Sequence, residues 1–500
     1  YGDWFEGMGR EHHTGEVFLN NKSLYEKETL DKVLTPVPNE KSKDKEGSTY
    51  TWYCENDGVN TTIWANFHTY NPNKELVEIS TRPTCFYPEK PGINYLTIQG
   101  FHISQAATQW GAPTAEQIGM IATHWNKGWI IENNIISNSK CSGITLGKER
   151  KTGHNVWLND TSLDGSLHYI EVTFNTIRNG WNKENIGSHI VRNNEISHCE
   201  QTGICGSMGA AFSLVENNHI HDIWVKRQFT GAEIGGIKFH AAVDTRIIHN
   251  RIHNAGRALW LDWMTQGTRV SGNLFYDNDM EDLFLEVNHG PFLVDNNIFA
   301  SRRSILEQSQ GGAYVHNLIV GEIYRYVEHG RYTPYFQPHS TEVAGLSIIP
   351  GGDDRYINNL FATVLPLNEK DSKRKYGLAD YNGTVYPMMV DGNVYYNGAL
   401  PFEDEKNKVV LLDFIPNVKV DEMADGVYLS FSVKGLEGLQ TSRVTTERLG
   451  KAKLPRQAFD QPDGSPIDIA TDYLGNARGN QPKPGPLESI RDGEVRIKVW

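Results

Sequence analysis

LVDNNIF at residues 293–299 is one copy of a short pattern that recurs through the middle of the chain. The pattern is an aliphatic residue followed by asparagine, any residue, and isoleucine or phenylalanine. The other copies are IIENNII, IVRNNEI, LVENNHI, IIHNRI, RVSGNLF, YVHNLI and YINNLF, and the asparagines fall at 134, 194, 218, 250, 273, 297, 317 and 359. Several intervals are 20 to 24 residues long, which is the period of a β-solenoid coil. The repeat therefore predicts a parallel β-helix.

The asparagine at a fixed place in each coil has a physical reason. Asparagine tolerates the left-handed turn conformation, and its side-chain amide can hydrogen-bond to the same amide in the next coil. The longer gaps between copies indicate loops inserted between coils. Chance recurrence of asparagine-rich turns is the alternative explanation.

The segments on either side of the repeat also indicate β-structure. In residues 1–88 the alternating segments EVFLNN, STYTWYCE, TTIWANF and LVEIST are separated by polar turns, which predicts a small antiparallel β-sandwich. The β-helix is expected over residues 89–398. In residues 399–500, VVLLDF and DGVYLSFSV predict further strands that complete the helix or pack on it. The predicted fold class is all-β.

Composition limits the partners of the chain. With 61 acidic and 48 basic residues the net charge is -13, which disfavours nucleic acid and anionic membranes and suits a neutral ligand. Five cysteines are too few and too scattered for a disulfide framework, and none has a CxxC spacing. We therefore expect reduced thiols and a cytoplasmic location, and we predict no metal and no cofactor.

Three charged residues occupy related places in successive coils. The segments EIGGIKFHAA, RALWLDWMTQ and DLFLEVNHGP precede the asparagines at 250, 273 and 297. Aligning the coils by these asparagines places Lys238, Asp262 and Glu286 level with one another at intervals of 24 residues. The apolar neighbours of each alternate with it and should face the core, so the three charged side chains should point outward as a column. A solvated ladder of ion pairs is the alternative interpretation.

The spacing of the two acids favours one kind of chemistry. Adjacent rungs of a parallel sheet lie about 4.8 Å apart. Retaining glycosidases hold their carboxyls about 5 to 5.5 Å apart, whereas inverting enzymes need about 6.5 to 9.5 Å. Two acids this close should have pKa values that separate. Because Lys238 should keep Asp262 charged, we predict Asp262 as the nucleophile and Glu286 as the general acid and base.

Other polar and aromatic residues surround the predicted column. His240 and Asn288 lie two residues further along their strands on the same face, and Glu233 lies in the turn before GGIKFH. The same alternation turns Trp260 outward, where it is expected to form a wall for a pyranose ring. The predicted substrate-binding residues are Glu233, Lys238, His240, Trp260, Asn288 and His124.

GGIKFHAA, LWLDWMTQGTR and FLEVNHGPFLVDNNI resemble the signature segments of glycoside hydrolase family 120. THWNKGWIIENNIIS, KCSGITLGKE, GEVFLNNKSLYE and STYTWYCE extend the resemblance from about residue 14 to residue 300. The resemblance implies a right-handed parallel β-helix with an attached β-sandwich. It also implies a homo-oligomeric, retaining, exo-acting β-xylosidase that acts on xylobiose and short xylo-oligosaccharides. Its nucleophile falls on Asp262, its acid/base on Glu286, and a third, sugar-binding acid on Glu233.

Two other functions are alternatives for a β-helix. The first is a pectin-degrading β-helix enzyme. The chain contains GGDD at 351–354 and RIK at 496–498, but it lacks the NTD and GHG motifs that polygalacturonases pair with them. The negative net charge also argues against an acidic polymer as substrate. A non-catalytic carbohydrate-binding β-helix is the second alternative, and the sequence leaves it open.

Overall fold

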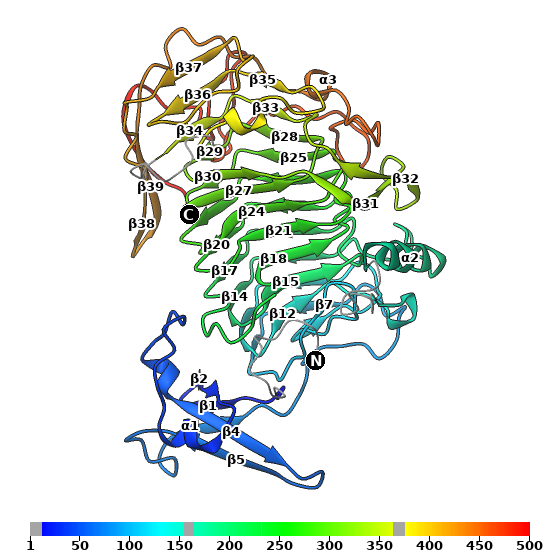
Figure 1. Cartoon of the computed structure of the whole chain (residues 1–500), viewed down its shortest axis with the longest axis vertical. Coiled ribbons are helices and arrows are strands. Elements are labelled where there is room, and N and C mark those ends of the chain that lie inside the picture. Colours follow the sequence, from blue (N-terminus) through cyan, green and yellow to red (C-terminus); the bar gives the residue numbers. More distant parts are fainter. Residues whose placement is uncertain (1–12, 155–164, 232, 364–375) are drawn as a thin grey trace.

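The computed structural model describes residues 13–154, 165–231, 233–363 and 376–500. Its main body is a long stack of parallel strands, with a small unit of N-terminal strands at one end and the C-terminal segments at the other (Figure 1). Residues 1–12 of the predicted sandwich lie outside the described residues. Among the residues described, no helix has the length and apolar character needed to cross a bilayer.

Three parallel sheets run along the stack, and most coils add one strand to each. The first consists of β7 (Thr97–Gln99), β10 (Ile130–Glu132), β13 (Ile190–Arg192), β16 (Leu214–Glu216), β19 (Arg246–Ile248), β22 (Thr268–Ser271), β25 (Phe292–Asp295), β28 (Gly312–Val315), β33 (Arg355–Ile357) and β35 (Met389–Asp391). The second consists of β8 (His102–Ser104), β11 (Ile135–Ser139), β14 (Glu195–Cys199), β17 (His219–His221), β20 (Arg251–His253), β23 (Leu274–Tyr276), β26 (Ile298–Phe299), β29 (Leu318–Ile319), β34 (Leu360–Ala362), β36 (Asn393–Tyr396) and β37 (Lys408–Leu411). The third consists of β9 (Ile121–Ala122), β12 (Ser142–Thr145), β15 (Thr202–Ser207), β18 (Gly235–His240), β21 (Leu259–Asp262), β24 (Glu281–Glu286), β27 (Arg303–Gln308) and β30 (Glu322–Arg325). This is the predicted parallel β-helix.

The repeated apolar positions stack into a continuous core. In the first sheet Ile131 pairs with Val191, Val191 with Val215, and Val215 with Ile247. All four side chains are fully buried. Burial of an aliphatic residue at the same place in every coil supplies the hydrophobic driving force that a single coil lacks.

In the repeated turn of each coil, two neighbouring positions carry the two roles predicted for asparagine. The stacked asparagines, from Asn134 onward, each donate from Nδ2 to Oδ1 of the next asparagine along the helix at 2.9–3.1 Å, ending on Glu405. The left-handed conformation belongs to the residue before each of them, such as Asn133 (φ 56°) and His249 (φ 51°). The predicted amide ladder is confirmed, and the left-handed turn lies one residue earlier.

Two long gaps in the repeat hold insertions. The gap from Asn134 to Asn194 contains helix α2 (Gly165–Arg178), and the gap from Asn317 to Asn359 contains the hairpin of β31 (Glu328–Phe336) and β32 (Val343–Ile349). Both lie on the same side of the stack, beside the third sheet (Figure 1). The predicted inserted loops are thus present, and they border one sheet.

The N-terminal unit has two small sheets around a core that contains Trp52. One sheet has the order β2 (Lys22–Ser23), β1 (Val17–Leu19), β6 (Val77–Ile79), and the other has β3 (Tyr25–Glu26), β4 (Thr51–Asn56), β5 (Thr61–Asn66), with α1 (Leu30–Leu34) alongside. The strands pair antiparallel as predicted, except that β3 and β4 are parallel.

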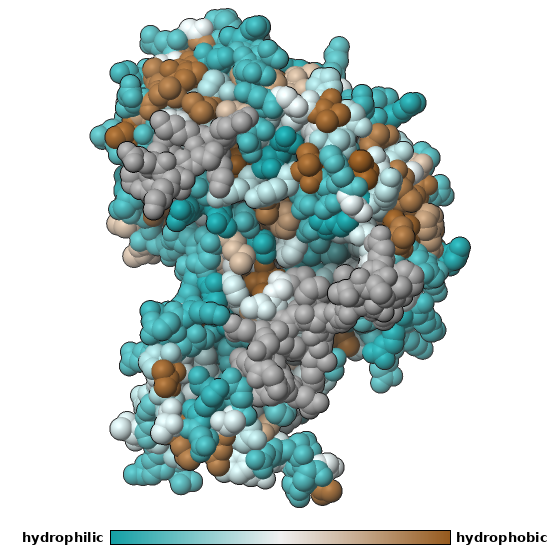
Figure 2. All heavy atoms as spheres, in the orientation of Figure 1, coloured by the Kyte–Doolittle hydropathy of each residue, from teal (hydrophilic) through white to brown (hydrophobic). Residues whose placement is uncertain are grey.

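Buried ion pairs attach this unit to the helix. Lys226 Nζ lies 2.6 Å from Glu16 Oε1, and Lys140 Nζ lies 3.1 Å from Glu26 Oε2. In Figure 2 the left edge of the junction is hydrophilic. Charged contacts therefore help to hold the N-terminal unit in place.

The C-terminal segments cover the outer face of the second sheet. Strand β37 extends that sheet, and an antiparallel sheet is formed by β38 (Lys419–Met423), β39 (Gly426–Val433) and β40 (Gly493–Lys498). Leu429 of β39 packs in one apolar cluster with Leu274 and Ile298 of the helix. A short helix, α3 (Thr446–Leu449), lies between β39 and β40 in the chain. The predicted C-terminal strands therefore both extend the helix and pack on it.

Candidate active site

The outer face of the third sheet carries the predicted acids on neighbouring rungs. Leu261 pairs with Leu285, so Asp262 is level with Glu286. Asp262 also pairs with His240, and Glu286 with Gln308. The column therefore reads His240, Asp262, Glu286, Gln308.

Lys238 does not lie in this column, and its predicted register is wrong. Lys238 pairs with Trp260. Asn250 follows His240 by 10 residues, whereas Asn273 follows Asp262 by 11, so the turn after β18 is one residue shorter. Lys238 precedes Asn250 by 12 residues, so exact alignment by the asparagines places Phe239, not Lys238, level with Asp262, and the shorter turn moves the pairing one residue further, to His240.

Asp262 is nevertheless surrounded by cationic and donor groups. Its Oδ2 accepts from Lys238 Nζ at 2.9 Å and lies 3.1 Å from His240 Nε2, and its Oδ1 accepts from the Trp263 backbone N–H at 2.7 Å. Burial alone would raise the pKa of this carboxyl, but Lys238 and His240 outweigh burial and hold the pKa well below its usual range. Asp262 is therefore a carboxylate at neutral pH, as a nucleophile requires.

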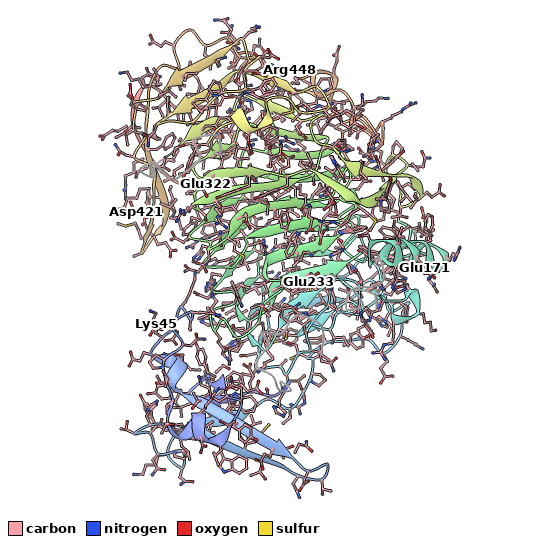
Figure 3. All side chains as sticks on the ribbon, viewed as in Figure 1. Lys45, Glu171, Glu233, Glu322, Asp421 and Arg448 are labelled. Atoms are coloured by element: carbon pink, nitrogen blue, oxygen red, sulfur yellow. The ribbon has the colours of Figure 1, made fainter. Side chains whose placement is uncertain are left out.

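Lys238 links the acids of the site. It is fully buried, and its Nζ also donates to Glu233 Oε1 at 3.0 Å. Glu233 lies two residues before the start of β18, beside the third sheet (Figure 3). His240 is held from its other side by the hydroxyl of Tyr169, 2.7 Å from Nδ1. The predicted trio of Glu233, Lys238 and His240 is thus one hydrogen-bonded cluster beside Asp262.

Glu286 has the opposite electrostatic setting. Burial and the negative charge of Asp262 raise the pKa of this carboxyl, and Arg331 only partly offsets them. Its Oε2 accepts from Trp260 Nε1 at 3.1 Å, and its Oε1 lies 2.7 Å from Arg331 Nη1. Two acids on adjacent rungs are therefore tuned in opposite directions, which suits an acid/base beside a nucleophile.

Trp260 has a different place from the one predicted. The Lys238 ammonium lies 3.8 Å from the ring centroid, and Phe284 of the next rung stacks on the ring at 5.0 Å. The side chain of Arg257 also contacts the ring, at 4.6 Å. Other side chains thus pack against the ring, so it does not form an open wall for a sugar. Its N–H instead orients Glu286.

Two other predicted binding residues lie away from the acid pair. Asn288 is fully buried, and its side chain accepts from the Thr265 backbone N–H and donates to the Leu261 carbonyl, which commits it to a turn. His124 follows β9, three strands before β18, and its Nε2 lies 2.8 Å from Glu149 Oε2. The structure does not bring either residue to Asp262 or Glu286.

The insertions supply residues that the sequence interpretation missed. Tyr169 comes from α2 and contacts His240, whereas Arg331 comes from β31 and contacts Glu286. Trp263 packs edge-on against Tyr169 with 4.8 Å between ring centroids. The only sequence signal for Tyr169 and Arg331 was the length of the gaps that contain them, which marks an insertion without saying which residue points inward.

Comparisons with known proteins place the chain in a family. A model of the glycoside hydrolase 120 insertion domain matches residues 1–79, and a right-handed β-helix model matches residues 121–319. A solved structure of XylC in complex with xylose is 41% identical, covers 100% of this chain and 83% of its own, and superposes with a TM-score of 0.95. The chain belongs to glycoside hydrolase family 120. It is therefore a glycoside hydrolase with the predicted right-handed β-helix.

More distant matches add nothing to this assignment. The structure of pectate lyase Pel9A is 11% identical, covers 80% of this chain and 88% of its own, and has a TM-score of 0.36. A comparison with curated proteins finds no match. The family 120 assignment thus depends on the insertion-domain model and on the match to XylC.

Proposed function

We propose that this family 120 member is a retaining, exo-acting β-xylosidase that hydrolyses xylobiose and short xylo-oligosaccharides. The observation that carries the proposal is the opposite tuning of two acids on adjacent rungs, with the pKa of Asp262 lowered and that of Glu286 raised. The 41% identical XylC was solved with xylose, which supports the choice of sugar.

The proposed reaction has two steps. Asp262 attacks the anomeric carbon while Glu286 gives its proton to the glycosidic oxygen, so the leaving sugar departs and a glycosyl ester forms. Glu286, now a carboxylate, then takes a proton from water, and the resulting hydroxide attacks the same carbon and releases Asp262. Arg331 stabilises the ionised Glu286 between the steps. Two inversions give net retention.

The surroundings of the acid pair support binding of a short sugar. Oε2 of Glu233 is buried and has no hydrogen-bond partner in the described part of the chain, so it is available to a sugar hydroxyl. Helix α2 and hairpin β31/β32 both reach the column, through Tyr169 and Arg331. Walls built by two insertions suit a site for few sugar units.

The anomer released first tests this function. Proton NMR of xylobiose hydrolysis should show β-xylose before mutarotation produces the α form. Initial α-xylose would mean inversion and would contradict Asp262 as nucleophile. Binding of xylobiose without hydrolysis would instead support the carbohydrate-binding alternative.

The homo-oligomer implied by the family resemblance is also a proposal. Light scattering coupled to size-exclusion chromatography should give a mass that is a multiple of the 56.4 kDa chain. A monomeric mass across micromolar concentrations would contradict it.

A further inference from the structure

Three histidines gather on the outer face of the second sheet, whereas the acid pair lies on the third. His219 and His221 are two residues apart on β17 and so share a face, and His253 of β20 pairs with His221 in register. One ring nitrogen of each histidine lies within 4.8 Å of one from each of the others. Within residues 13–154, 165–231, 233–363 and 376–500, this is the only cluster of His, Cys, Asp or Glu with that spacing.

The hydrogen bonds of the cluster leave nitrogen atoms available as ligands. His221 Nδ1 lies 2.7 Å from Asp222 Oδ2, which places the proton on Nδ1 and the lone pair on Nε2. His221 Nε2 is buried and has no hydrogen-bond partner in the described part of the chain. A carboxylate that binds the far nitrogen in this way is the usual support of a metal-binding histidine.

The other two histidines contact each other across neighbouring rungs. Their Nε2 atoms face each other at 2.9 Å, so at least one of the two carries a lone pair rather than a proton. Neutral imidazoles with free lone pairs are the form in which histidine binds metals.

Carboxylates complete the surroundings. Glu195 pairs with His219 in register, is half exposed, and has its Oε1 3.6 Å from His221 Nε2. Arg251 of β20 pairs with His219 of β17. Its positive charge is offset by Glu422, whose Oε1 lies 2.9 Å from Arg251 Nη2. Glu195 and Asp222 line a cavity of about 610 Å³ between the N-terminal unit and the helix.

We propose that His219, His221 and His253, with Glu195 as a fourth ligand, form a binding site for a divalent transition metal of the Zn²⁺ class. Imidazole nitrogen with one carboxylate favours Zn²⁺, Ni²⁺ or Cu²⁺ over Ca²⁺ and Mg²⁺. The sequence interpretation predicted no metal. Since the site lies on a different sheet from the acids, the ion would stabilise the second sheet rather than take part in hydrolysis.

A ladder of stacked rings is the competing explanation. His221, His253 and Tyr276 stack on successive rungs, with ring centroids 5.4 and 4.7 Å apart. Such a ladder stabilises a sheet without any ion and predicts no specific metal binding. The two explanations therefore differ in a direct measurement.

Calorimetric titration of Zn²⁺ into the tag-free, chelator-treated full chain tests the site. One equivalent should bind, and His219→Gln and His221→Gln should each weaken binding at least tenfold. His102→Gln is the matched control, because His102 is exposed on the same face of the same sheet, three rungs before His219. It should bind like wild type.

Two measurements on the unaltered chain keep the proposal testable if the variants fold poorly. Stoichiometric Co²⁺ should give the visible absorption of a four-coordinate histidine site, and Zn²⁺ should raise the thermal midpoint in a concentration-dependent manner. Absence of stoichiometric binding, or binding as strong as that of wild type in both folded variants, would overturn the proposal in favour of the ring ladder.

Discussion

His240 and Asp262 face each other across neighbouring rungs, paired in register, with Nε2 of the histidine 3.1 Å from Oδ2 of the aspartate. Together with Lys238 this contact places positive charge on one side of the acid pair. Glu286, one rung further, faces the charge of Asp262 instead. The asymmetry of the column is what separates the proposed roles of the two acids.

Asp262→Asn should lower kcat at least about 10³-fold, because it removes the proposed nucleophile while keeping the side-chain shape. Steady-state hydrolysis of an aryl β-xyloside measures the loss. Glu171→Gln, an exposed change on α2 (Figure 3), is the control and should match wild type. Wild-type turnover in Asp262→Asn would exclude the proposed mechanism.

Glu286→Gln should affect substrates according to their leaving groups. Hydrolysis of xylobiose should fall about 10²–10⁴-fold, because its leaving sugar needs a proton. Formation of the glycosyl ester from an aryl xyloside with an acidic phenol should fall less. Pre-steady-state release of the phenol measures that first step. Equal losses in the first step for both substrates would contradict the role of Glu286 as general acid.

The pH dependence of kcat/KM should have two limbs. Asp262 must be ionised, so activity falls as the pH drops through its lowered pKa, and Glu286 must be protonated, so activity falls as the pH rises through its raised pKa. Arg331→Gln removes a cation that stabilises ionised Glu286, so the basic limb should move to higher pH. Arg331→Lys keeps the charge and should move it less. A shift to lower pH in Arg331→Gln would contradict this role.

Trp260→Phe separates two roles of an aromatic residue. The structure gives the indole N–H to Glu286 and covers the ring with Lys238 and Phe284, so the loss of that N–H should lower kcat about tenfold with little change in KM. Initial rates on xylobiose measure both constants. A large rise in KM with unchanged kcat would instead support the sugar-stacking role predicted from sequence.

Asn194→Ala should destabilise the helix by about 2–4 kcal/mol, because it removes a buried amide that bonds to Asn218 and the Ile131 carbonyl and leaves Asn134 without its acceptor. Urea unfolding measures the free energy. Asn193→Gly is the control, since Asn193 is exposed with φ 55°, a conformation that glycine adopts freely. Similar losses in both variants would contradict the importance of the amide ladder.

The β-helix could be predicted from the sequence because its determinants are local and repeated. Each coil carries the same aliphatic stripe and the same asparagine, and a residue such as Asn297 meets the same residue type, Asn273 or Asn317, above and below it. Alternation along β21 and β24 likewise turns Asp262 and Glu286 to one face. Period and alternation were enough to bring these two acids together.

Only the tertiary structure decided the register of Lys238 and the sources of Tyr169 and Arg331. The turn after β18 is one residue shorter, so even exact asparagine spacing would place Phe239 rather than His240 level with Asp262. Tyr169 reaches His240 and Arg331 reaches Glu286 from insertions that have no repeat, so their positions depend on packing against the helix. Local periodicity fixes what recurs along a solenoid, whereas contacts between an insertion and its sheet depend on where the chain returns in space.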